Sequence, residues 1–405
     1  MTEINQIIDR ADEADYADDE LELEPFQTGK VVLLSGGHAV HDTYTAFLAP
    51  LLPVLIEKFS LLKTEAGLLS LFMQSPSILQ PVIGHMADSL SMRYFVILAP
   101  AITGTMMSLL GIAPSYLVLA IFLLIAGFSS AGLHAVGPVM AGRVSGSSLG
   151  RGMGFWMVGG ELGRTVGPIL LVTAIGYLSL GGLTWLMIGG WVVSGFLFLR
   201  LRAIPGHDPG AAEALPWRAA LSAMRPLMLP LSGVLTARAF MSASITTYLP
   251  MFLIDEGVGL WLSGAALTVL EAAGVVGAIV GGSISDKIGR KVVLLISMVG
   301  TPIFAFAFLR TSGLVQALLL PALGFFALST TPVIMAWVQE SYMENRALAN
   351  GVYMAMGFLI RAVVVVILGR VGDLVGLRQG FQYSAIIMLL GIPLVFFLPH
   401  QNKRT

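Results

Sequence analysis

The chain has 405 residues, of which 56% are hydrophobic and only 12% are charged, and its mean hydropathy is +0.84. A soluble globular domain carries about a quarter charged residues, so this composition excludes a soluble protein and indicates a polytopic membrane protein. The formal net charge is −1, and cysteine is absent, which excludes disulfides, thiolate metal sites and a cysteine nucleophile.

The first 30 residues differ in charge from the rest of the chain. Residues 1–24 contain ten acidic residues and one basic residue, Arg10, whereas the chain from residue 31 onward contains 21 Lys and Arg against 14 Asp and Glu. We therefore expect residues 1–30 to form a solvated, disordered acidic tail. This tail lacks the basic region and short apolar stretch of a cleavable signal peptide.

Twelve apolar stretches follow, each close to the roughly 20 residues that cross a bilayer as a helix. We predict an all-α membrane protein with twelve transmembrane helices in two pseudo-symmetric six-helix bundles. The predicted spans are 31–57, 65–84, 94–113, 116–142, 151–178, 183–201, 226–254, 261–283, 292–310, 314–341, 349–376 and 380–398. The long polar connection 202–225 divides them, giving an N-terminal bundle at 31–201, a cytoplasmic linker at 202–225, a C-terminal bundle at 226–398 and a cytoplasmic tail at 399–405.

The distribution of basic residues predicts the orientation. Connections and termini on the side of the N-terminus hold fifteen Lys and Arg residues, and the opposite side holds five. Positive charge is retained on the inner side of a membrane, so we expect a multi-pass protein of the inner cell membrane with both termini in the cytoplasm.

The two halves of the chain contain related segments. Residues 154–164 align without gaps on residues 351–361, with Gly, Met, Gly, Leu and Arg in common, so that Arg164 and Arg361 occupy equivalent positions. An arginine inside hydrocarbon is costly and usually faces a bundle interior or an aqueous cavity. The repeat predicts a duplicated secondary transporter with a positively charged centre, whose substrate site lies at the midplane between the repeats.

The first span carries a cluster of titratable residues. His38, His41 and Asp42 lie within about a 100° arc of one helix face. A carboxylate beside imidazoles in a dry cavity suits a proton relay, which is the interpretation we favour. A divalent metal site at the same three residues is an alternative. A hydrogen-bonded cluster that only joins two helices is another, and His134 could join either functional set.

Three arginines are candidates for binding an anionic substrate: Arg164, Arg238 and Arg361. Glu161 lies three residues before Arg164 and can pair with it, whereas the equivalent residue before Arg361 is Phe358. Guanidinium groups form forked bonds to phosphonate or carboxylate. Binding of an anion and binding of a proton could therefore compete, because each changes the net charge of the same group of buried residues. The groups assigned to proton coupling are His38, His41, Asp42, His134, Glu161 and Glu271.

A loop motif follows the eighth span. Residues 282–291 read Gly-Ser-Ile-Ser-Asp-Lys-Ile-Gly-Arg-Lys, which resembles the signature G-x-x-x-D-[KR]-x-G-R-[RK] of the major facilitator superfamily. The resemblance implies the twelve-helix transporter fold, and it implies gating roles for Gly282, Asp286, Gly289, Arg290 and Lys291. The copy in the first half keeps only Gly84 and Asp88, to which we assign the same role.

The fifth span contains small residues at every fourth position: Gly159, Gly163 and Gly167, followed by Pro168. This pattern resembles the superfamily's helix 5 signature, which is associated mainly with antiporters. Close packing of two helices is an alternative explanation for the same pattern.

A narrower resemblance covers most of the first half. Gly37-His38-Ala39-Val40-His41-Asp42, residues 79–88, the stretch from His134 to Arg143 and residues 158–170 resemble the fosmidomycin-resistance branch of the superfamily. That branch typically has His-x-x-Asn-Asp in helix 1 and His-Pro-Glu in helix 4. Here His41 replaces the asparagine and no carboxylate follows His134. The resemblance implies a proton-driven antiporter that exports drugs or small phosphonate-like anions.

Other functions remain in competition. The same arginine centre could serve uptake of an organic or phosphorylated anion, and the first-span cluster could transport a divalent metal ion. An intramembrane enzyme is disfavoured, because His38-x-x-His41 lacks the spacing and glutamate of zinc proteases. No nucleophile elbow or nucleotide-binding loop is present. We therefore expect a monomeric transporter, not an enzyme, that needs no cofactor, binds no nucleic acid, and interacts with a small-molecule substrate, protons and the lipid bilayer.

Overall fold

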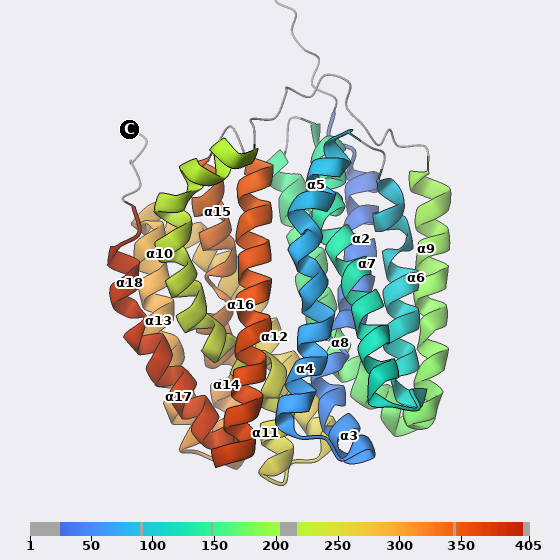
Figure 1. Cartoon of the computed structure of the whole chain (residues 1–405), viewed down its shortest axis with the longest axis vertical. Coiled ribbons are helices and arrows are strands. Elements are labelled where there is room, and N and C mark those ends of the chain that lie inside the picture. Colours follow the sequence, from blue (N-terminus) through green and yellow to red (C-terminus); the bar gives the residue numbers. More distant parts are fainter. Residues whose placement is uncertain (1–24, 90–91, 147–148, 203–216, 343–345, 400–405) are drawn as a thin grey trace, which may run out of the picture.

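The structure is a computed structural model that describes residues 25–89, 92–146, 149–202, 217–342 and 346–399 (Figure 1). Within these ranges the chain is helical and contains no strand. Residues 1–24 of the predicted acidic tail, residues 203–216 of the predicted linker and residues 400–405 lie outside the described residues. The tail was predicted to reach residue 30, but the first described helix already begins at Thr28. The first-half helices are α2 (Thr28–Thr45), α3 (Leu48–Phe59), α4 (Lys63–Gln74), α5 (Gln80–Ser89), α6 (Arg93–Leu109), α7 (Tyr116–Arg143), α8 (Leu149–Gly182) and α9 (Met187–Leu201).

The second-half helices begin with α10, which starts inside the predicted linker. They are α10 (Trp217–Ala243), α11 (Leu249–Asp255), α12 (Leu260–Ile288), α13 (Arg290–Leu309), α14 (Gly313–Leu328), α15 (Thr331–Ser341), α16 (Arg346–Val375), α17 (Leu377–Leu390) and α18 (Ile392–Phe396).

The long helices run roughly side by side along the vertical axis of Figure 1. Eleven segments of the described chain are long and apolar enough to cross a membrane. The longest, 152–201, has 50 residues, which as one helix would measure about 75 Å, more than twice the ~30 Å of hydrocarbon. Non-helical dihedrals at Ser179 (φ 61°, ψ 174°) break it, and α8 and α9 form its two parts. This segment therefore crosses twice, which agrees with the predicted twelve-helix fold.

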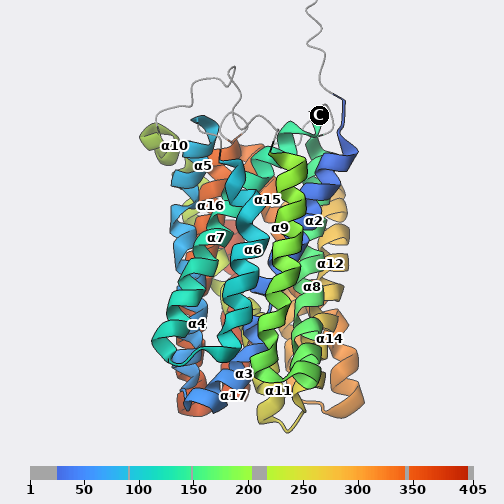
Figure 2. The ribbon, with the colours of Figure 1, turned by 90° about the vertical axis from the view of Figure 1, so that its right-hand side faces the viewer.

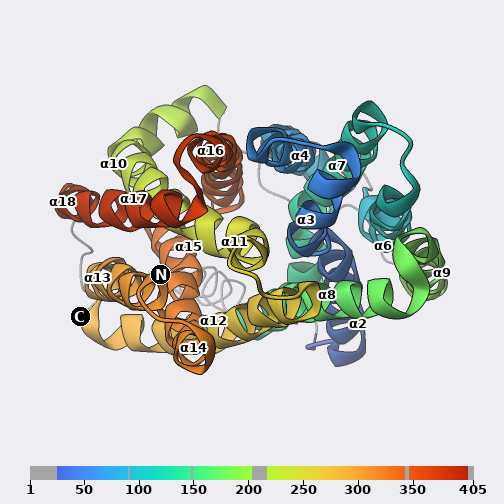
Figure 3. The same ribbon diagram turned by 90° about the horizontal axis from the view of Figure 1, so that it is seen from below.

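The helices form two groups, which are seen end-on in Figure 3, with α2–α9 on one side and most of α10–α18 on the other. Within the first group α8 packs on α2, and α6 packs on α7 and α9. Within the second group α12 packs on α14, and α10 packs on α16. The two groups meet mainly through two helix pairs, α4 with α16 and α8 with α12.

Two of the predicted spans are interrupted at equivalent places in the repeat. The first span breaks between Thr45 and Leu48, and a π-helical turn at Ser244–Tyr248 separates α10 from α11. A proline follows each break, Pro50 in the first half and Pro250 in the second. Proline lacks an N–H donor and clashes with the preceding turn, so these interruptions follow from the sequence.

The two halves share one buried apolar cluster. It contains Phe47 and Leu69 of the first half and Tyr248 and Phe252 of the second. The short helices α3 and α11, which contribute residues to it, lie at the lower end of Figure 1. Near the upper end, the first half has a separate apolar cluster around Trp156. The described chain also begins and ends at this upper end (Figure 2). The halves are therefore sealed together at the lower end.

Polar contacts reinforce that seal. The Asp373 carboxylate of α16 accepts hydrogen bonds from the backbone N–H groups of Lys63 (2.7 Å) and Thr64 (2.9 Å), at the start of α4. Lys63 Nζ lies 3.3 Å from Asp255 Oδ2, and the Tyr248 hydroxyl lies 3.4 Å from the carbonyl oxygen of Lys63. Asp373 therefore caps a first-half helix with a second-half side chain.

Candidate transport site

The glycine row of α8 lies directly against α2. A Cβ atom at Gly159, Gly163 or Gly167 would fall under 3.0 Å from a backbone oxygen of α2. Only glycine therefore permits this approach of the two helices. The glycines at every fourth position therefore serve close packing of α8 on α2. The same contact brings the α8 side chains beside the titratable face of α2.

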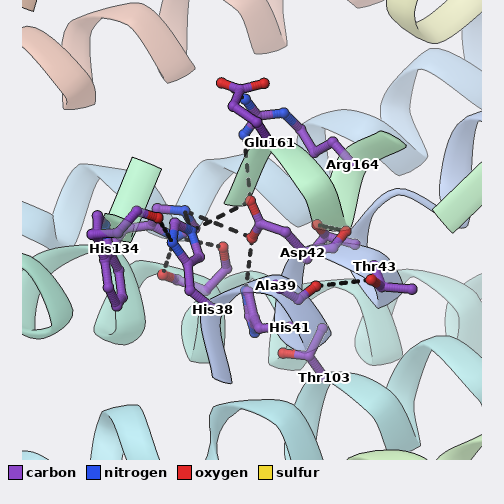
Figure 4. Close-up of polar contacts among 12 residues, drawn as sticks. His38, Ala39, His41, Asp42, Thr43, Thr103, His134, Glu161 and Arg164 are labelled. Atoms are coloured by element: carbon purple, nitrogen blue, oxygen red, sulfur yellow. Dashed lines mark hydrogen bonds and ion pairs between the residues drawn. The ribbon is translucent and has the colours of Figure 1, made fainter. Parts of the chain in front are cut away.

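Asp42 is the centre of the polar cluster that this packing creates (Figure 4). Its side chain is buried (3% exposed). Its Oδ2 lies 3.4 Å from His38 Nε2 and 3.3 Å from Arg164 Nη1. Its Oδ1 lies 3.8 Å from His134 Nε2 and 3.9 Å from His41 Nε2. Five residues assigned from the sequence thus come together, from α2, α7 and α8.

Two of the imidazoles are fixed by backbone carbonyls. His38 Nδ1 lies 2.9 Å from the carbonyl oxygen of Trp156, and His134 Nδ1 lies 2.9 Å from that of Ser130. A carbonyl oxygen can only accept, so both Nδ1 atoms carry the hydrogen. The two Nε2 atoms then face each other at 3.4 Å, and each carries a lone pair when its ring is neutral.

Trp156 supports this arrangement in a second way. Its ring stacks on the His38 ring, with a centroid distance of 4.0 Å and an interplanar angle of 20°. No spacing pattern in the sequence marks Trp156 or Ser130 for these contacts. Trp156 acts through its carbonyl and ring face, and Ser130 mainly through its carbonyl.

His41 differs from the other two histidines. Its side chain is completely buried, and neither ring nitrogen has a hydrogen-bond partner among the described residues. The ligand-type atoms of His38, Asp42 and His134 lie within 4.8 Å of one another. The alternative metal set expected from the sequence contained His41, whereas the structure groups His134 with His38 and Asp42.

Arg164 faces the interior of the molecule. Its side chain is 40% exposed, although it contacts the buried Asp42 and forms an ion pair with Glu161. The exposed apolar side chains of α8 lie on the opposite face of the helix: Phe155, Val158, Leu162 and Val166. These apolar residues face lipid, so the exposed part of Arg164 lines interior space.

Arg361 occupies the equivalent place in α16 but has different partners. It donates to three hydroxyls of α10 and the π-helical turn: Ser242 Oγ at 3.1 Å, Thr246 Oγ1 at 2.7 Å and Thr247 Oγ1 at 2.9 Å. Among the described residues no carboxylate oxygen lies within 4.0 Å of it. The direct hydrogen-bond partners of its guanidinium in the described chain are therefore neutral hydroxyls. These hydroxyls had no role in the sequence analysis.

Arg238 also lacks a carboxylate partner among the described residues. Its Nη2 donates to the carbonyl oxygen of Ala327 at 3.2 Å, and its Nε is buried without a partner in the described part of the chain. Ser242 follows it by four residues, so Arg238 and the hydroxyl bound to Arg361 share one face of α10.

Glu271 of α12 stands between the two halves. Its side chain is buried (7% exposed) and interacts electrostatically with Arg164 and Glu161 of the first half and with Arg361 of the second. No described cation lies within 4.0 Å of its carboxylate. The predicted pairing of Glu271 with an arginine is thus a longer-range interaction with two of them.

The loop motif of the second half forms a compact ionic cluster away from this centre. Arg290 Nη1 lies 2.6 Å from Asp286 Oδ1, and Arg290 Nη2 lies 2.7 Å from Glu340 Oε1 of α15. Gly289 has a φ of +95°, which favours glycine at this turn. Lys291 donates to the carbonyl oxygen of Leu398. Glu340 was missed from the sequence, because nothing in its neighbourhood links it to a loop 50 residues earlier.

The other motif glycines are not at tight contacts. A Cβ at Gly282 would meet only Pro332, at 4.0 Å, and one at Gly84 would meet nothing within 4 Å. The close approach is made instead by Gly281, whose Cβ would fall 2.7 Å from the Ser329 carbonyl oxygen. The side chain of Asp88 lies outside the described part of the structure.

Comparison with known proteins identifies the family. A model of the Major Facilitator Superfamily matches residues 34–322 and 266–405. The chain belongs to this superfamily. It is 25% identical over 386 residues to the fosmidomycin resistance protein of Escherichia coli K12, covering 92% of this chain and 93% of that protein. It is 23% identical, with the same coverage, to the uncharacterized MFS-type transporter YfnC of Bacillus subtilis 168.

Solved structures support the fold. A crystal structure of a bacterial homologue of the human lysosomal transporter Spinster, in an inward-facing and occupied conformation, superimposes with a TM-score of 0.78. The identity is 14%, and the match covers 92% of this chain and 97% of that one. The protein is therefore a multi-pass membrane transporter of this superfamily and not an enzyme, as the loop motif predicted.

Proposed function

We propose that this superfamily member is a proton-coupled antiporter that exports a small phosphonate-like organic anion or drug. The observation that carries the proposal is the pair of equivalent arginines with unlike partners. Arg164 is bound by two carboxylates, whereas Arg361 is held by hydroxyls alone. In the first half, protonation of the carboxylates would change the pairing of Arg164. In the second half, Arg361 can take an anion as its charged partner.

The anion site lies between α10 and α16. Arg361 supplies a planar fork that matches two oxygens of a phosphonate or carboxylate. The hydroxyls of Thr246 and Thr247, which now accept from Arg361, can rotate and donate to a bound anion. Arg238, on the same face of α10 as Ser242, adds a second cation without a carboxylate partner in the described chain.

The proton site lies between α2, α7 and α8. Protonation of Asp42 or of an adjacent imidazole weakens the attraction between Asp42 and Arg164, because the carboxylate loses charge or gains a competing cation. The guanidinium of Arg164 then depends more on Glu161 and Glu271. Since Glu271 also interacts with Arg361, a proton in the first half changes the charge balance around the anion site in the second.

Alternating access follows from the seal at the lower end. In the arrangement described, contacts of Asp373 and Tyr248 with Lys63 join the halves there, while toward the upper end the first half has an apolar cluster of its own. Basic residues of helix ends and turns at the upper end support a cytoplasmic location for that end and an inward-facing state. They include Lys30, Arg93, Arg143, Arg202 and Arg290.

The name of the Escherichia coli relative supports an export role for this chain. A fungal relative of 27% identity over 256 residues, which spans 60% of this chain and 50% of that protein, is named an aspyridones efflux protein. We place the protein in the inner cell membrane with both termini in the cytoplasm. We propose a monomer as the working unit.

Transport by purified protein in proteoliposomes tests this function. When a pH gradient is imposed, a labelled phosphonate should move in the direction opposite to the protons. An ionophore that collapses the gradient should stop this movement. Arg361→Ala should reduce the rate at least about 100-fold, since it removes two or more charge-assisted bonds. Arg370→Ala, an exposed arginine on the same helix, is the matched control and should transport normally.

Two outcomes would contradict the proposal. Movement in the same direction as the protons would replace export with uptake. Unchanged transport by Arg361→Ala would remove this arginine from the anion site.

A further inference from the structure

We propose that His38, Asp42 and His134 form a binding site for a divalent transition-metal ion of the Zn²⁺ type, which competes with protons for the same lone pairs. The sequence alone had offered a metal site only as an alternative, and with His41 as a ligand. Ion binding can be measured without transport, so this inference does not depend on the anion proposed above.

Two of the distances between the candidate ligand atoms match those around a tetrahedral ion. His38 Nε2 lies 3.4 Å from His134 Nε2 and 3.4 Å from Asp42 Oδ2. Zinc–nitrogen and zinc–oxygen bonds of about 2.0–2.1 Å at tetrahedral angles place ligand atoms about 3.3–3.4 Å apart. His134 Nε2 lies 3.8 Å from the other carboxylate oxygen, Asp42 Oδ1, so a movement of the Asp42 and His134 side chains would complete the set around one ion.

The imidazoles are oriented as metal ligands are. A ligating histidine usually donates its other ring N–H to a carbonyl or carboxylate, which fixes the tautomer and aims the lone pair. His38 and His134 both do so, through the carbonyl oxygens of Trp156 and Ser130. Stacking of Trp156 on His38 further restrains that ring. The two lone pairs thus converge from rigid helices, α2 and α7.

A hydrogen bond alone accounts for this geometry less well. A proton shared by two groups draws those two atoms to about 2.7–3.2 Å and leaves the third outside. Here three acceptor groups stand at similar, longer separations around one point. Arg164 offsets the charge of the Asp42 carboxylate from one side, but the facing lone pairs of the two neutral imidazoles have no donor between them, which a proton or one multivalent cation would supply.

The donor set indicates the class of ion. Two imidazoles and one carboxylate suit zinc and similar first-row ions, and the chain has no cysteine to select softer metals. Three protein ligands leave a fourth position open, as in zinc sites that also bind water or substrate. The charged neighbours are Arg164, Glu161, Glu271 and His41.

Arg164 is the group that an incoming cation would displace. It lies 3.3 Å from Asp42 Oδ2 and already pairs with Glu161 through its other terminal nitrogen. Its side chain is 40% exposed, so it can turn toward Glu161 and Glu271 when Asp42 binds an ion. Arg164 would therefore keep a carboxylate partner whether or not Asp42 binds an ion.

A Co²⁺ titration of the full-length protein in detergent, purified without a histidine tag, tests the proposal. We expect one ion per chain, visible absorption bands typical of tetrahedral Co²⁺, and displacement by Zn²⁺. Where binding displaces one proton, the affinity should fall about tenfold for each pH unit lowered. X-ray absorption of the zinc-loaded wild type should show two imidazoles and oxygen ligands, without sulfur.

Three variants test which residues are ligands. His134→Ala should weaken binding at least about 100-fold, because it removes a ligand. His41→Ala, which removes an equally close imidazole outside the set, should change the affinity less than about threefold. Asp42→Asn keeps the side-chain shape and should resemble His134→Ala. Each variant is checked for a monodisperse elution profile before titration.

Several results would overturn the inference. They are wild-type protein that takes up neither ion, His134→Ala that binds as tightly as the wild type, and His41→Ala that loses as much affinity as His134→Ala. The X-ray absorption of the wild type decides the question by itself if a variant fails to fold. Failure of the anion transport assay would leave this result unchanged.

Discussion

Arg164 and Arg361 stand at equivalent positions of the two halves, yet their surroundings have opposite chemistry. Arg164 contacts the carboxylates of Asp42 and Glu161, and Arg361 contacts only the hydroxyls of Ser242, Thr246 and Thr247. The repeat has kept the cation and changed its partners. A duplicated fold can in this way give one half a proton-sensitive cation and the other an anion-binding cation.

The side chains on two equivalent helix contacts explain the difference. Glycines on α8 let α2 approach so closely that Asp42 reaches Arg164. The equivalent helix α16 packs on α10, the second-half counterpart of α2, but there Ser242 and the π-helical turn Ser244–Tyr248 present hydroxyls to Arg361. Such π-helical turns inside α-helices occur frequently at functional sites. The two environments are therefore set by the side chains that α2 and α10 present, because each arginine helix meets the equivalent neighbour.

The largest difference between the two halves is expected from alanine substitutions at two equivalent glycines, Gly160 and Gly357. A Cβ at Gly160 would fall 2.6 Å from His38 Cε1 and 3.1 Å from Asp42 Oδ2, while one at Gly357 would meet nothing within 4 Å. Gly160→Ala should therefore distort the proton site, destabilise the protein by about 1–3 kcal/mol and reduce gradient-driven transport at least about tenfold.

Gly357→Ala is the matched control, and it should leave transport and thermal stability unchanged or slightly raised. Melting curves and transport rates of both variants measure the effect. Equal losses in the two variants would show that the halves do not differ in this way.

A second, smaller effect concerns the shape of the cation. Arg361→Lys replaces a planar fork by a point charge, so the affinity for a phosphonate should fall about tenfold, or about 1.4 kcal/mol. Arg164→Lys should change that affinity less than threefold, or about 0.7 kcal/mol, because this cation serves the carboxylates. Titration calorimetry with one phosphonate measures both. A larger loss in Arg164→Lys would reverse the roles assigned to the two arginines.

The smallest expected effect lies at the seal of the lower end. Asp373→Ala removes the cap on α4, which is worth about 1–2 kcal/mol, so the lower end should open more often. Because the chain has no cysteine, labelling of a single cysteine placed at the buried position Ala66 should become several-fold faster. Asp255→Asn breaks only the partly exposed ion pair with Lys63 and should have little effect. Slower labelling in Asp373→Ala would contradict this role of the seal.

Much of this architecture could be predicted from the sequence. Apolar segments near 20 residues and the loop motif at 282–291 were sufficient for the fold, because the bilayer restricts how a chain can cross it. The contact between Glu161 and Arg164 followed from helical spacing. The grouping of His38, His41 and Asp42 on one helix face was also correct as far as a single helix allows.

Contacts between helices could not be predicted in the same way. The replacement of His41 by His134 as the close neighbour of His38, and the hydroxyls around Arg361, depend on which helices pack together and how they are rotated. The support of His38 by the Trp156 carbonyl uses a backbone group that every residue has. A single sequence carries no signal for such contacts.

The division of roles between the two arginines is tested most directly by comparing two transport modes in proteoliposomes, exchange of labelled for unlabelled anion and transport driven by a pH gradient. Arg361→Ala should lose both modes, since it cannot hold the anion. Asp42→Asn should keep exchange and lose the response to the gradient. If Asp42→Asn lost exchange as completely as Arg361→Ala, or if Arg361→Ala exchanged normally, the account would be contradicted.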